Sequence, residues 1–188
     1  MSMRDGASLG VEAARRLAAL GRADIGPGLT DGEFAVVEAE FGFEFADDHR
    51  AFLAAGLPLG GFWPDWRSRA RRPLRAVLQL PVNGVMFAVE WNDFWDDRWG
   101  RRPARMKDAL RTVRYRLERV PRMVPVFGNR FLPAGRGSFG HPVLSMYQTE
   151  IRCHADDLVH FIDNEFGPGP HRPSMARPTV EFWSGLAP

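Results

Sequence analysis

A tryptophan-rich stretch from Trp91 to Pro103 places the strongest constraint on how this chain can fold. It holds half of the six tryptophans, Trp91, Trp95 and Trp99, among three aspartates and three arginines. A tryptophan side chain is costly to leave in water, so the cluster either builds a core or presents a surface on which a partner docks. The stretch carries no nucleophile with a nearby base, no metal-ligand spacing and no phosphate loop. It therefore favours binding over catalysis.

The composition is that of a domain able to fold by itself. Of 188 residues, 45% are hydrophobic and 26% charged, which suffices for one domain or one domain with an appendage. The formal net charge of +2 is too small to assume that nucleic acid or a membrane attracts the whole molecule. Cys153 is the single cysteine, which excludes an intramolecular disulfide. With no signal-peptide pattern and no apolar run of roughly 18 residues, we expect a cytoplasmic protein.

Hydrophobic periodicity predicts helices at both ends and strands toward the middle. The expected helices run from Leu9 to Leu20, from a Thr30–Glu33 capping box to Gly42, from Asp47 to Leu53, from Pro103 to Val120, and from Asp156, as the cap, to Gly167. Alternating residues predict strands over Gly84–Trp91, Met123–Phe127 and Val143–Ile151. The segment from Gly56 to Trp66 is too rich in glycine and proline for regular structure.

This order of elements predicts an α+β fold. It fits a mainly antiparallel sheet of about five to six strands flanked by helices, since a strict β-α-β alternation is missing. We expect an amino-terminal helix over residues 1–28, the α+β domain over 29–166 and a Pro- and Gly-rich extension over 167–188. The extension should follow the surface irregularly, pinned by Phe182 and Trp183.

Short motifs follow one another in a characteristic order from about Leu29 to Phe166. They are Leu29-Thr30 with Glu33 and Glu38, Phe41-Gly42, Arg50-Ala51-Phe52-Leu53, Gly56-Leu57-Pro58, Phe62-Trp63-Pro64-Asp65-Trp66, Gly84-Val85-Met86-Phe87, Phe94-Trp95, Trp99-Gly100 with Arg102-Pro103, Val124-Pro125-Val126-Phe127-Gly128, Pro142-Val143-Leu144-Ser145 and Asp157-Leu158. In this order the chain resembles the SUKH superfamily, which comprises bacterial immunity proteins and relatives that include a yeast cell-wall assembly regulator. The resemblance implies an α+β sheet with helices against it, a non-catalytic role and, for many bacterial members, neutralisation of a cognate toxin by direct binding.

Several patterns typical of catalytic or ligand sites lack the context that their chemistry needs. The glycines from Gly135 to Gly140 match a dinucleotide-binding motif, but Pro142 and a strand follow where a helix should begin. Aromatic residues beside the aspartates of the tryptophan-rich stretch suit a carbohydrate site, yet sequence cannot supply the separation between two carboxylates. Cys153 fits a small buried hydrophobe better than a reactive thiol. A metal site is disfavoured although several ligand types cluster at His154, Asp156, Asp157, His160 and Asp163.

Charge is unevenly distributed along the chain. Six carboxylates and no basic residue occur from Glu33 to Asp48, whereas ten basic residues from Arg98 to Arg122 are accompanied only by Asp108 and Glu118. The asymmetry either orients a partner or marks two solvated helix faces. A further set beside Trp63 and Trp66 either binds single-stranded nucleic acid, which we consider unlikely, or bridges to the acidic helices; it comprises Arg67, Arg69, Arg71, Arg72 and Arg75.

We therefore expect a non-catalytic protein-binding module without cofactor or metal, and by resemblance an immunity protein that neutralises a toxin. A regulatory or scaffolding protein and a small enzyme acting on a sugar or nucleotide are the alternatives. A sequence pI near 9.2 favours an acidic or neutral partner. The expected contact residues are Trp63, Trp66, Asp93, Trp95, Asp96, Asp97, Trp99, Arg101, Arg102, Asn129 and Arg130. If two or more of these tryptophans are wholly buried, they belong to the core and the contact surface must be sought elsewhere.

Overall fold

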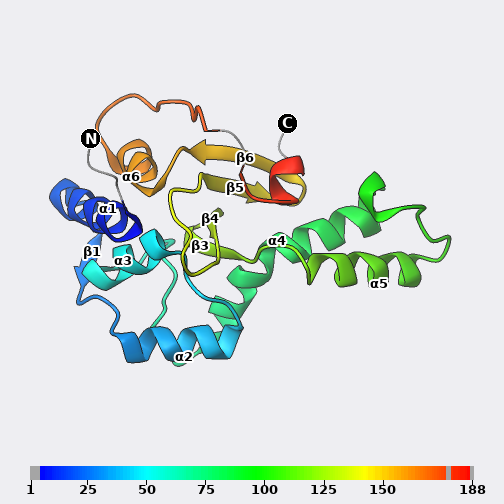
Figure 1. Ribbon diagram of the computed structural model, residues 1–188, viewed down its shortest axis with the longest axis horizontal. Helices are drawn as coiled ribbons and strands as arrows, with labels where there is room; N and C mark the ends of the chain where they lie inside the picture. The colour runs from blue at the N-terminus through cyan, green and yellow to red at the C-terminus, as the bar shows by residue number, and fades with distance from the viewer. Residues whose placement is uncertain (1–4, 177–178, 187–188) are drawn as a thin grey trace.

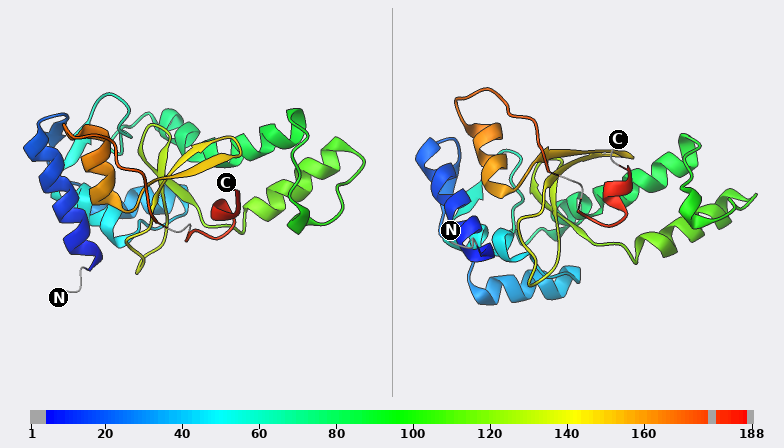
Figure 2. Two further views of the ribbon diagram at one scale, coloured as in Figure 1. Left: turned by 90° about the horizontal axis from the view of Figure 1, so that it is seen from above. Right: turned by 45° about the horizontal axis from the view of Figure 1, so that its top comes forward.

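Two hydrophobic cores on opposite faces of one sheet organise the fold of residues 5–176 and 179–186, which the computed structural model describes. The first core joins one face of the sheet to helices α1 (Gly6–Leu20), α2 (Asp31–Phe41), α3 (Asp47–Ala55) and α6 (Leu158–Phe166). The second joins the other face to α4 (Arg71–Trp91), α5 (Met106–Leu117) and the short 3-10 helices η1 (Asp97–Trp99) and η2 (Trp183–Leu186). Figures 1 and 2 show α4 and α5 extending side by side from the body as an arm.

The sheet divides its residues between the two cores because side chains alternate along each strand. Its strands β3 (Met123–Phe127), β4 (Arg130–Pro133), β5 (Val143–Tyr147) and β6 (Glu150–Ala155) are antiparallel and adjacent in chain order. Val124 and Leu132 face the first core, whereas Met123 and Phe131 face the second. A separate two-stranded sheet pairs β1 (Asp24–Gly26) with β2 (Leu57–Leu59). The α+β prediction is confirmed, but a single sheet of five to six strands is wrong, because the strands form two sheets.

The predicted start and end of α2 are confirmed, as are the end of α1 at Gly21 and the start of α3 at Asp47, whereas α1 begins at Gly6 and α3 ends at Ala55. Thr30 and Glu33 form the capping box of α2: Thr30 N–H donates to the Glu33 carboxylate (2.8 Å) and Glu33 N–H donates to Thr30 Oγ1 (3.3 Å). Gly42 ends the helix at φ 68°, a conformation that glycine adopts without steric cost. Gly10 lets α1 and α3 approach closely, since a Cβ there would lie 2.1 Å from the carbonyl oxygen of Asp48.

The predicted strand over Gly84–Trp91 is wrong, because these residues form the last turns of helix α4. Val85 and Val89 fit an alternating pattern with Phe87 and Trp91, but they are also spaced i, i+4, and both are buried. Ala88, between them, is buried too, whereas Phe87 and Trp91 are exposed, which fits the helical period and not alternation. Further differences are small: Leu57–Leu59 forms a strand, α5 is shorter than Pro103–Val120, and Val143–Ile151 belongs to the two strands of a hairpin.

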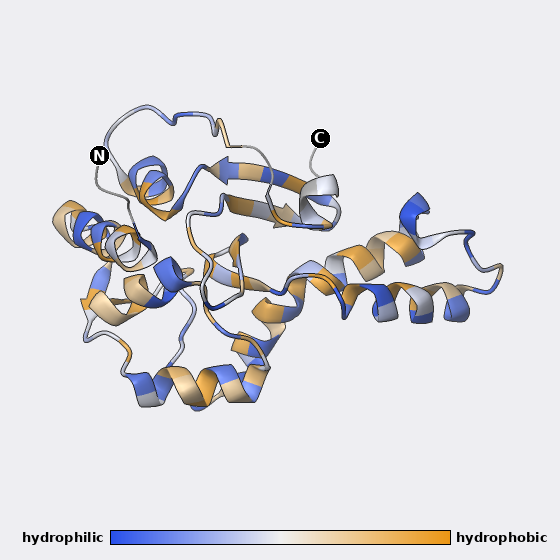
Figure 3. Ribbon diagram, in the orientation of Figure 1, coloured by the Kyte–Doolittle hydropathy of each residue, from blue (hydrophilic) through white to orange (hydrophobic). Residues whose placement is uncertain are grey.

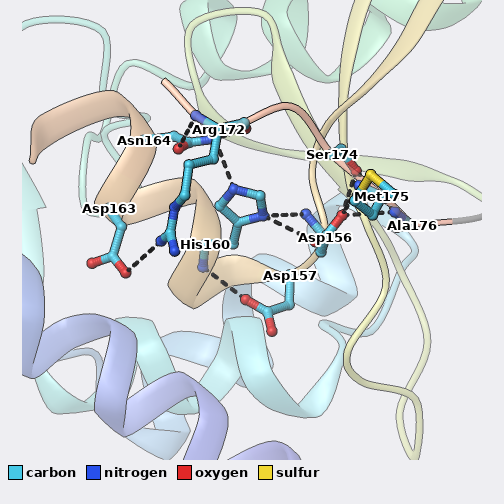
Figure 4. Close-up of polar contacts among 9 residues, drawn as sticks. All are labelled: Asp156, Asp157, His160, Asp163, Asn164, Arg172, Ser174, Met175 and Ala176. Carbon is cyan, nitrogen blue, oxygen red and sulfur yellow. Dashed lines mark hydrogen bonds and ion pairs between the residues drawn. The ribbon is translucent and has the colours of Figure 1, made fainter. Parts of the chain in front are cut away.

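Asp157, not Asp156, caps helix α6, and its side chain accepts a hydrogen bond from the backbone N–H of His160 (2.7 Å). Asp156 instead holds the extension that follows α6 (Figure 4): its Oδ1 accepts hydrogen bonds from Ser174 Oγ and from the N–H groups of Met175 and Ala176, at 2.6–2.7 Å. Burial raises the pKa of Asp156, but these hydrogen bonds outweigh it and lower the pKa below its ordinary value.

The extension is attached at two further points. Asn164 exchanges two hydrogen bonds with the backbone of Arg172 (2.7 and 3.0 Å), and the Arg172 guanidinium lies 3.6 Å from Asp163. Beyond it, Phe182 and Trp183 are buried in the second core, so the prediction that they pin the extension is confirmed. Arg177 and Pro178, part of the same prediction, lie outside the described residues.

Replacing Asp156 with alanine should free residues 174–176 while leaving the rest of the fold intact. Three hydrogen bonds to one carboxylate are lost, so amide exchange at Met175 and Ala176 should accelerate about tenfold or more. Hydrogen–deuterium exchange followed residue by residue measures this, with the buried amides of β5 as internal reference. Unchanged exchange at both amides would show that Asp156 does not hold the extension.

Candidate partner-binding surface

The outer end of the arm is shaped by the tryptophan-rich stretch. Trp99 is 7% exposed and packs edge-on against Trp95 and Phe94, with ring centroids 5.3 and 5.8 Å apart. On its other side it stacks on Phe182 at 6.0 Å, which ties the arm to the extension. Trp95 Nε1–H donates to the carbonyl oxygen of Gly100 (2.7 Å). The cluster therefore acts mainly as the core of the arm.

The aspartates of this stretch are partly neutralised by neighbouring arginines. Arg98 binds the buried carboxylate of Asp96, and this hydrogen bond, against the effect of burial, lowers the pKa of Asp96. Arg102 pairs with Asp93, donates to the carbonyl oxygen of Val89 (2.8 Å) and lies 5.8 Å from the ring centroid of Trp95. Arg102 and Asp93 thus close the turn that follows α4.

Five basic side chains of the arm have no ion-pair or side-chain hydrogen-bond partner among the described residues. All five are exposed: Arg101, Arg105, Lys107, Arg114 and Arg116. Their positions on α5 differ, since Lys107 and Arg114 lie along one edge of the buried stripe of Ala109 and Val113, and Arg116 lies along the other. The arm therefore presents positive charge on both of its sides.

The acidic helix α2, in contrast, is neutralised within the molecule. Its carboxylates accept hydrogen bonds and ion pairs from the arginines that follow it: Arg67 binds Glu33 (2.6 Å), Arg71 binds Glu40 (3.0 Å), Arg75 binds Glu40 (3.4 Å) and Arg50 binds Asp31 (2.7 Å). The hydrogen bond from Arg67 is the main cause that lowers the pKa of Glu33 to about 2. Three of the five arginines that suggested a nucleic-acid surface are thus used internally.

Trp66 is buried, at 2% exposure, among Phe43 and Phe45 in the first core. With Trp99 it makes two of the four predicted contact tryptophans core residues, which excludes both from a contact surface. Sequence alone could not predict which tryptophans are buried. The local sequence of a Gly- and Pro-rich loop is the same whether its tryptophan packs into a core or faces water.

Trp63 and the Asn129–Arg130 turn lie on the body, where Trp63 and Gly128 line a cavity with Leu74, Val77 and Leu80 from the first half of α4. The loop before Trp63 is held by Gly128 N–H, which donates to the carbonyl oxygen of Phe62 (2.9 Å). Trp63 stacks on Phe166 at 5.4 Å, and two cavities of about 420 and 440 Å³ flank it. The predicted contact residues therefore fall in two places, the end of the arm and this aromatic loop.

Arg130 belongs to a polar cluster on the body rather than to an open surface. Its Nη1 lies 3.3 Å from Ser145 Oγ and its Nη2 3.9 Å from Glu165, which also lies 3.1 Å from His154 Nε2. Burial, and then the nearby Arg130 charge, lowers the pKa of His154. Asn129 accepts a hydrogen bond from Arg130. The cluster neutralises its own charges.

The patterns that suggested ligand chemistry have structural roles. Gly135–Gly140 connects β4 to β5, and two of its N–H groups, from Gly137 and Gly140, donate to Asp47 and Asp48 at 2.9 Å. Burial raises the pKa of Cys153. Within residues 5–176 and 179–186 no three His, Cys, Asp or Glu side chains are arranged to hold a metal ion. Nor does that part of the chain contain a helix of the length and hydrophobicity needed to cross a membrane.

Sequence reasoning missed the exposed apolar face of α4. Leu80, Phe87 and Trp91 are 49%, 45% and 69% exposed, and Figure 3 shows hydrophobic residues recurring along this helix. The helical spacing of these residues could have revealed the face, had the segment not been interpreted as a strand.

Comparisons of the chain with protein-family models, with curated proteins and with solved structures find no match.

Proposed function

We propose that the chain is a non-catalytic protein-binding module whose arm receives an acidic partner. The observation that carries the proposal is the set of five arm cations without a side-chain partner among the described residues, whereas the carboxylates of the acidic helix α2 are already paired. Opposite potentials orient two proteins as they meet and raise the rate of association. The SUKH resemblance supports one class of partner, a bacterial toxin domain that the chain neutralises by covering it.

A protein fits the arm better than nucleic acid does. Binding of single strands without sequence preference uses exposed aromatic rings beside the cations, on which bases stack. Here Trp99 is buried, and Trp95 is half-buried with Arg102 next to its ring. Tyr115 is exposed, but the guanidinium of Arg119 lies 3.5 Å from its ring centroid.

Charge reversal on the arm should weaken binding to an acidic partner about tenfold or more, mainly by slowing association. The variant carries Arg101→Glu, Arg105→Glu and Arg114→Glu. The partner tested is the purified product of the gene immediately upstream, where that gene encodes a toxin-like domain. Calorimetry and stopped-flow kinetics at two salt concentrations give its affinity and its rate of association.

A matched control changes the net charge equally on the body. Arg22→Glu, Arg69→Glu and Arg152→Glu also reverse exposed arginines without ion pairs among the described residues, and should alter affinity about twofold or less. Equal losses in both variants would reduce the effect to net charge and reject the arm. Arm-dependent binding of a single-stranded oligonucleotide, without binding of any acidic protein domain, would replace this function with nucleic-acid recognition.

A further inference from the structure

The side chain of Asn164 on helix α6 holds the carboxy-terminal extension by two hydrogen bonds to one residue (Figure 4). Its Oδ1 accepts from the backbone N–H of Arg172 (3.0 Å), and its Nδ2 donates to the carbonyl oxygen of Arg172 (2.7 Å). A backbone N–H only donates and a carbonyl oxygen only accepts, so these two bonds, here called the Arg172 clamp, fix the orientation of the amide. The amide nitrogen also lies 2.9 Å from His160 Nε2.

The clamp requires His160 Nε2 to be an acceptor, because the amide of Asn164 offers it an N–H. A neutral imidazole carries one proton, and its other nitrogen accepts. With the proton on Nδ1, the ring donates to Asp156 Oδ2, which lies 3.2 Å from that nitrogen. The backbone N–H of Asp156 lies 3.1 Å from Nδ1 and favours the other tautomer, but there Nε2–H would face the N–H of Asn164. The carboxylate and the amide together therefore favour the proton on Nδ1.

A second proton on His160 is incompatible with the clamp. Both nitrogens of an imidazolium carry hydrogen, so Nε2–H would meet the amide N–H of Asn164, donor against donor. If the amide turns to offer its oxygen to the ring, its nitrogen faces the N–H of Arg172 and both bonds of the clamp are lost.

The charges around the ring do not prevent that proton from binding. The charged groups on the surrounding elements are Asp156 and Asp157 before α6, Asp163 and Glu165 on α6, Arg16 on α1 and Arg172 on the extension. Asp163 is paired with both arginines, and Glu165 with His154. The Asp156 carboxylate contacts the ring itself and would stabilise the imidazolium, whose cost is the loss of the clamp.

We infer that His160 is a pH-sensitive latch on the extension: as the pH falls through about 6.5, its protonation opens the Arg172 clamp. Above that pH the neutral ring accepts from Asn164 and the clamp stays closed. Asp156, whose pKa lies below its ordinary value, remains ionised on both sides of this pH, so its hydrogen bonds to residues 174–176 persist. Acid therefore releases one attachment of the extension and leaves the other. The inference does not depend on what the arm binds.

Opening the clamp also frees a second histidine. His171, next to Arg172 in the chain, has its ring centroid 5.3 Å from that of His154, which belongs to the polar cluster with Arg130 and Glu165. At neutral pH this contact covers one side of the His154 ring. In acid the segment before residue 174 can leave the cluster, which uncovers His154.

Amide exchange of the full chain at several pH values tests the inference. Protection factors, which correct for the intrinsic exchange rate at each pH, should fall about tenfold at Arg172 between about pH 7.5 and 5.5, because both clamp bonds are lost. Those of Met175 and Ala176 should stay unchanged. Nitrogen NMR of the His160 ring should find the proton on Nδ1 at neutral pH, and its titration should share the midpoint of the change at Arg172.

Three results would overturn the latch. They are constant protection at Arg172, an equal loss at Arg172, Met175 and Ala176, and a neutral His160 ring with its proton on Nε2.

His160→Gln removes the titrating group, so protection at Arg172 should no longer change with pH. His141→Gln, at a histidine that contacts Thr179 and lies outside the clamp, is the matched control and should leave the fall unchanged. His171→Gln should leave it unchanged as well. A fall that persists in His160→Gln, or that disappears in His171→Gln, would assign the effect to another group and reject the latch. Unchanged exchange within β5 shows that each variant is folded.

Asn164→Asp should reverse the direction of the pH effect. The new carboxylate accepts from the Arg172 N–H, and in acid it also accepts from Nε2–H of the imidazolium, whereas the neutral ring turns a lone pair toward it. Arg172 should therefore be better protected at about pH 5.5 than at about pH 7.5. A purely structural role of His160 would not change the sign. Protection that still falls in acid in this variant would contradict the proposed latch.

Discussion

Replacing Trp183 with alanine is expected to lower the free energy of unfolding by about 3 to 5 kcal/mol. Trp183 is 1% exposed in the second core, where its ring packs edge-on against Phe182 at 5.0 Å. Its Nε1–H donates to the carbonyl oxygen of Pro121 (2.7 Å). The substitution removes both the buried ring and this hydrogen bond, and it leaves a cavity between the arm and the sheet.

Chemical denaturation of the full chain measures the loss, with two variants as references. Trp183→Phe keeps most of the packing and loses the hydrogen bond, so it should lose roughly 1 to 3 kcal/mol. Tyr147→Ala, on an exposed ring, should change stability by less than about 1 kcal/mol. A Trp183→Ala protein as stable as the Tyr147→Ala protein would mean that the second core closes without the extension.

His49 should make the protein lose stability in mild acid. The ring is buried in the first core beside Phe45 and Trp66, and neither of its nitrogens has a hydrogen-bond partner. Burial lowers the pKa of His49 from 6.5 to about 3. Between these values the unfolded chain binds a proton that the folded chain does not. Stability therefore falls as pH decreases, by roughly 2 kcal/mol between about pH 6.5 and 5.

His49→Phe should abolish this part of the pH dependence. Denaturation of both proteins at several pH values gives the difference between their free energies of unfolding at each pH. The contributions of titrating groups that both proteins share cancel in this difference. Those groups include His154, whose lowered pKa acts in the same direction, and Asp48, whose pKa burial raises and which acts in the opposite direction. Glu33, with a pKa of about 2, acts only in stronger acid. A difference independent of pH would show that the His49 ring is protonated, or hydrated, inside the fold.

The features that could be predicted from sequence are those set by local chemistry. The Thr30–Glu33 capping box and the Gly42 helix end depend on residues within a few positions of each other, and both are as expected. The helical stripes of α1 and α5 could be predicted for the same reason. The expected α+β class followed from the order of such elements, and it too is confirmed.

What could not be predicted depends on contacts distant in sequence. Val85 and Val89 satisfy both a strand and a helix period, and only the packing of α4 against α5 and the sheet decides between them. Asp156 and Asp157 are equivalent as caps until the extension returns to α6 and engages Asp156. Trp63 and Trp66 lie in one loop, yet only Trp66 enters the core.

The position of Trp183 in the second core also bears on how the chain folds during synthesis. The helices of the first core and the strand faces that they cover are complete once α6 has been made, so that half can fold early. The other face of the same sheet is covered only in part, by α4 and α5, until Trp183 emerges from the ribosome, because this side chain completes its cover. During that interval Phe131 and Leu144 lack part of their packing, and only α4 and α5 exclude water from them.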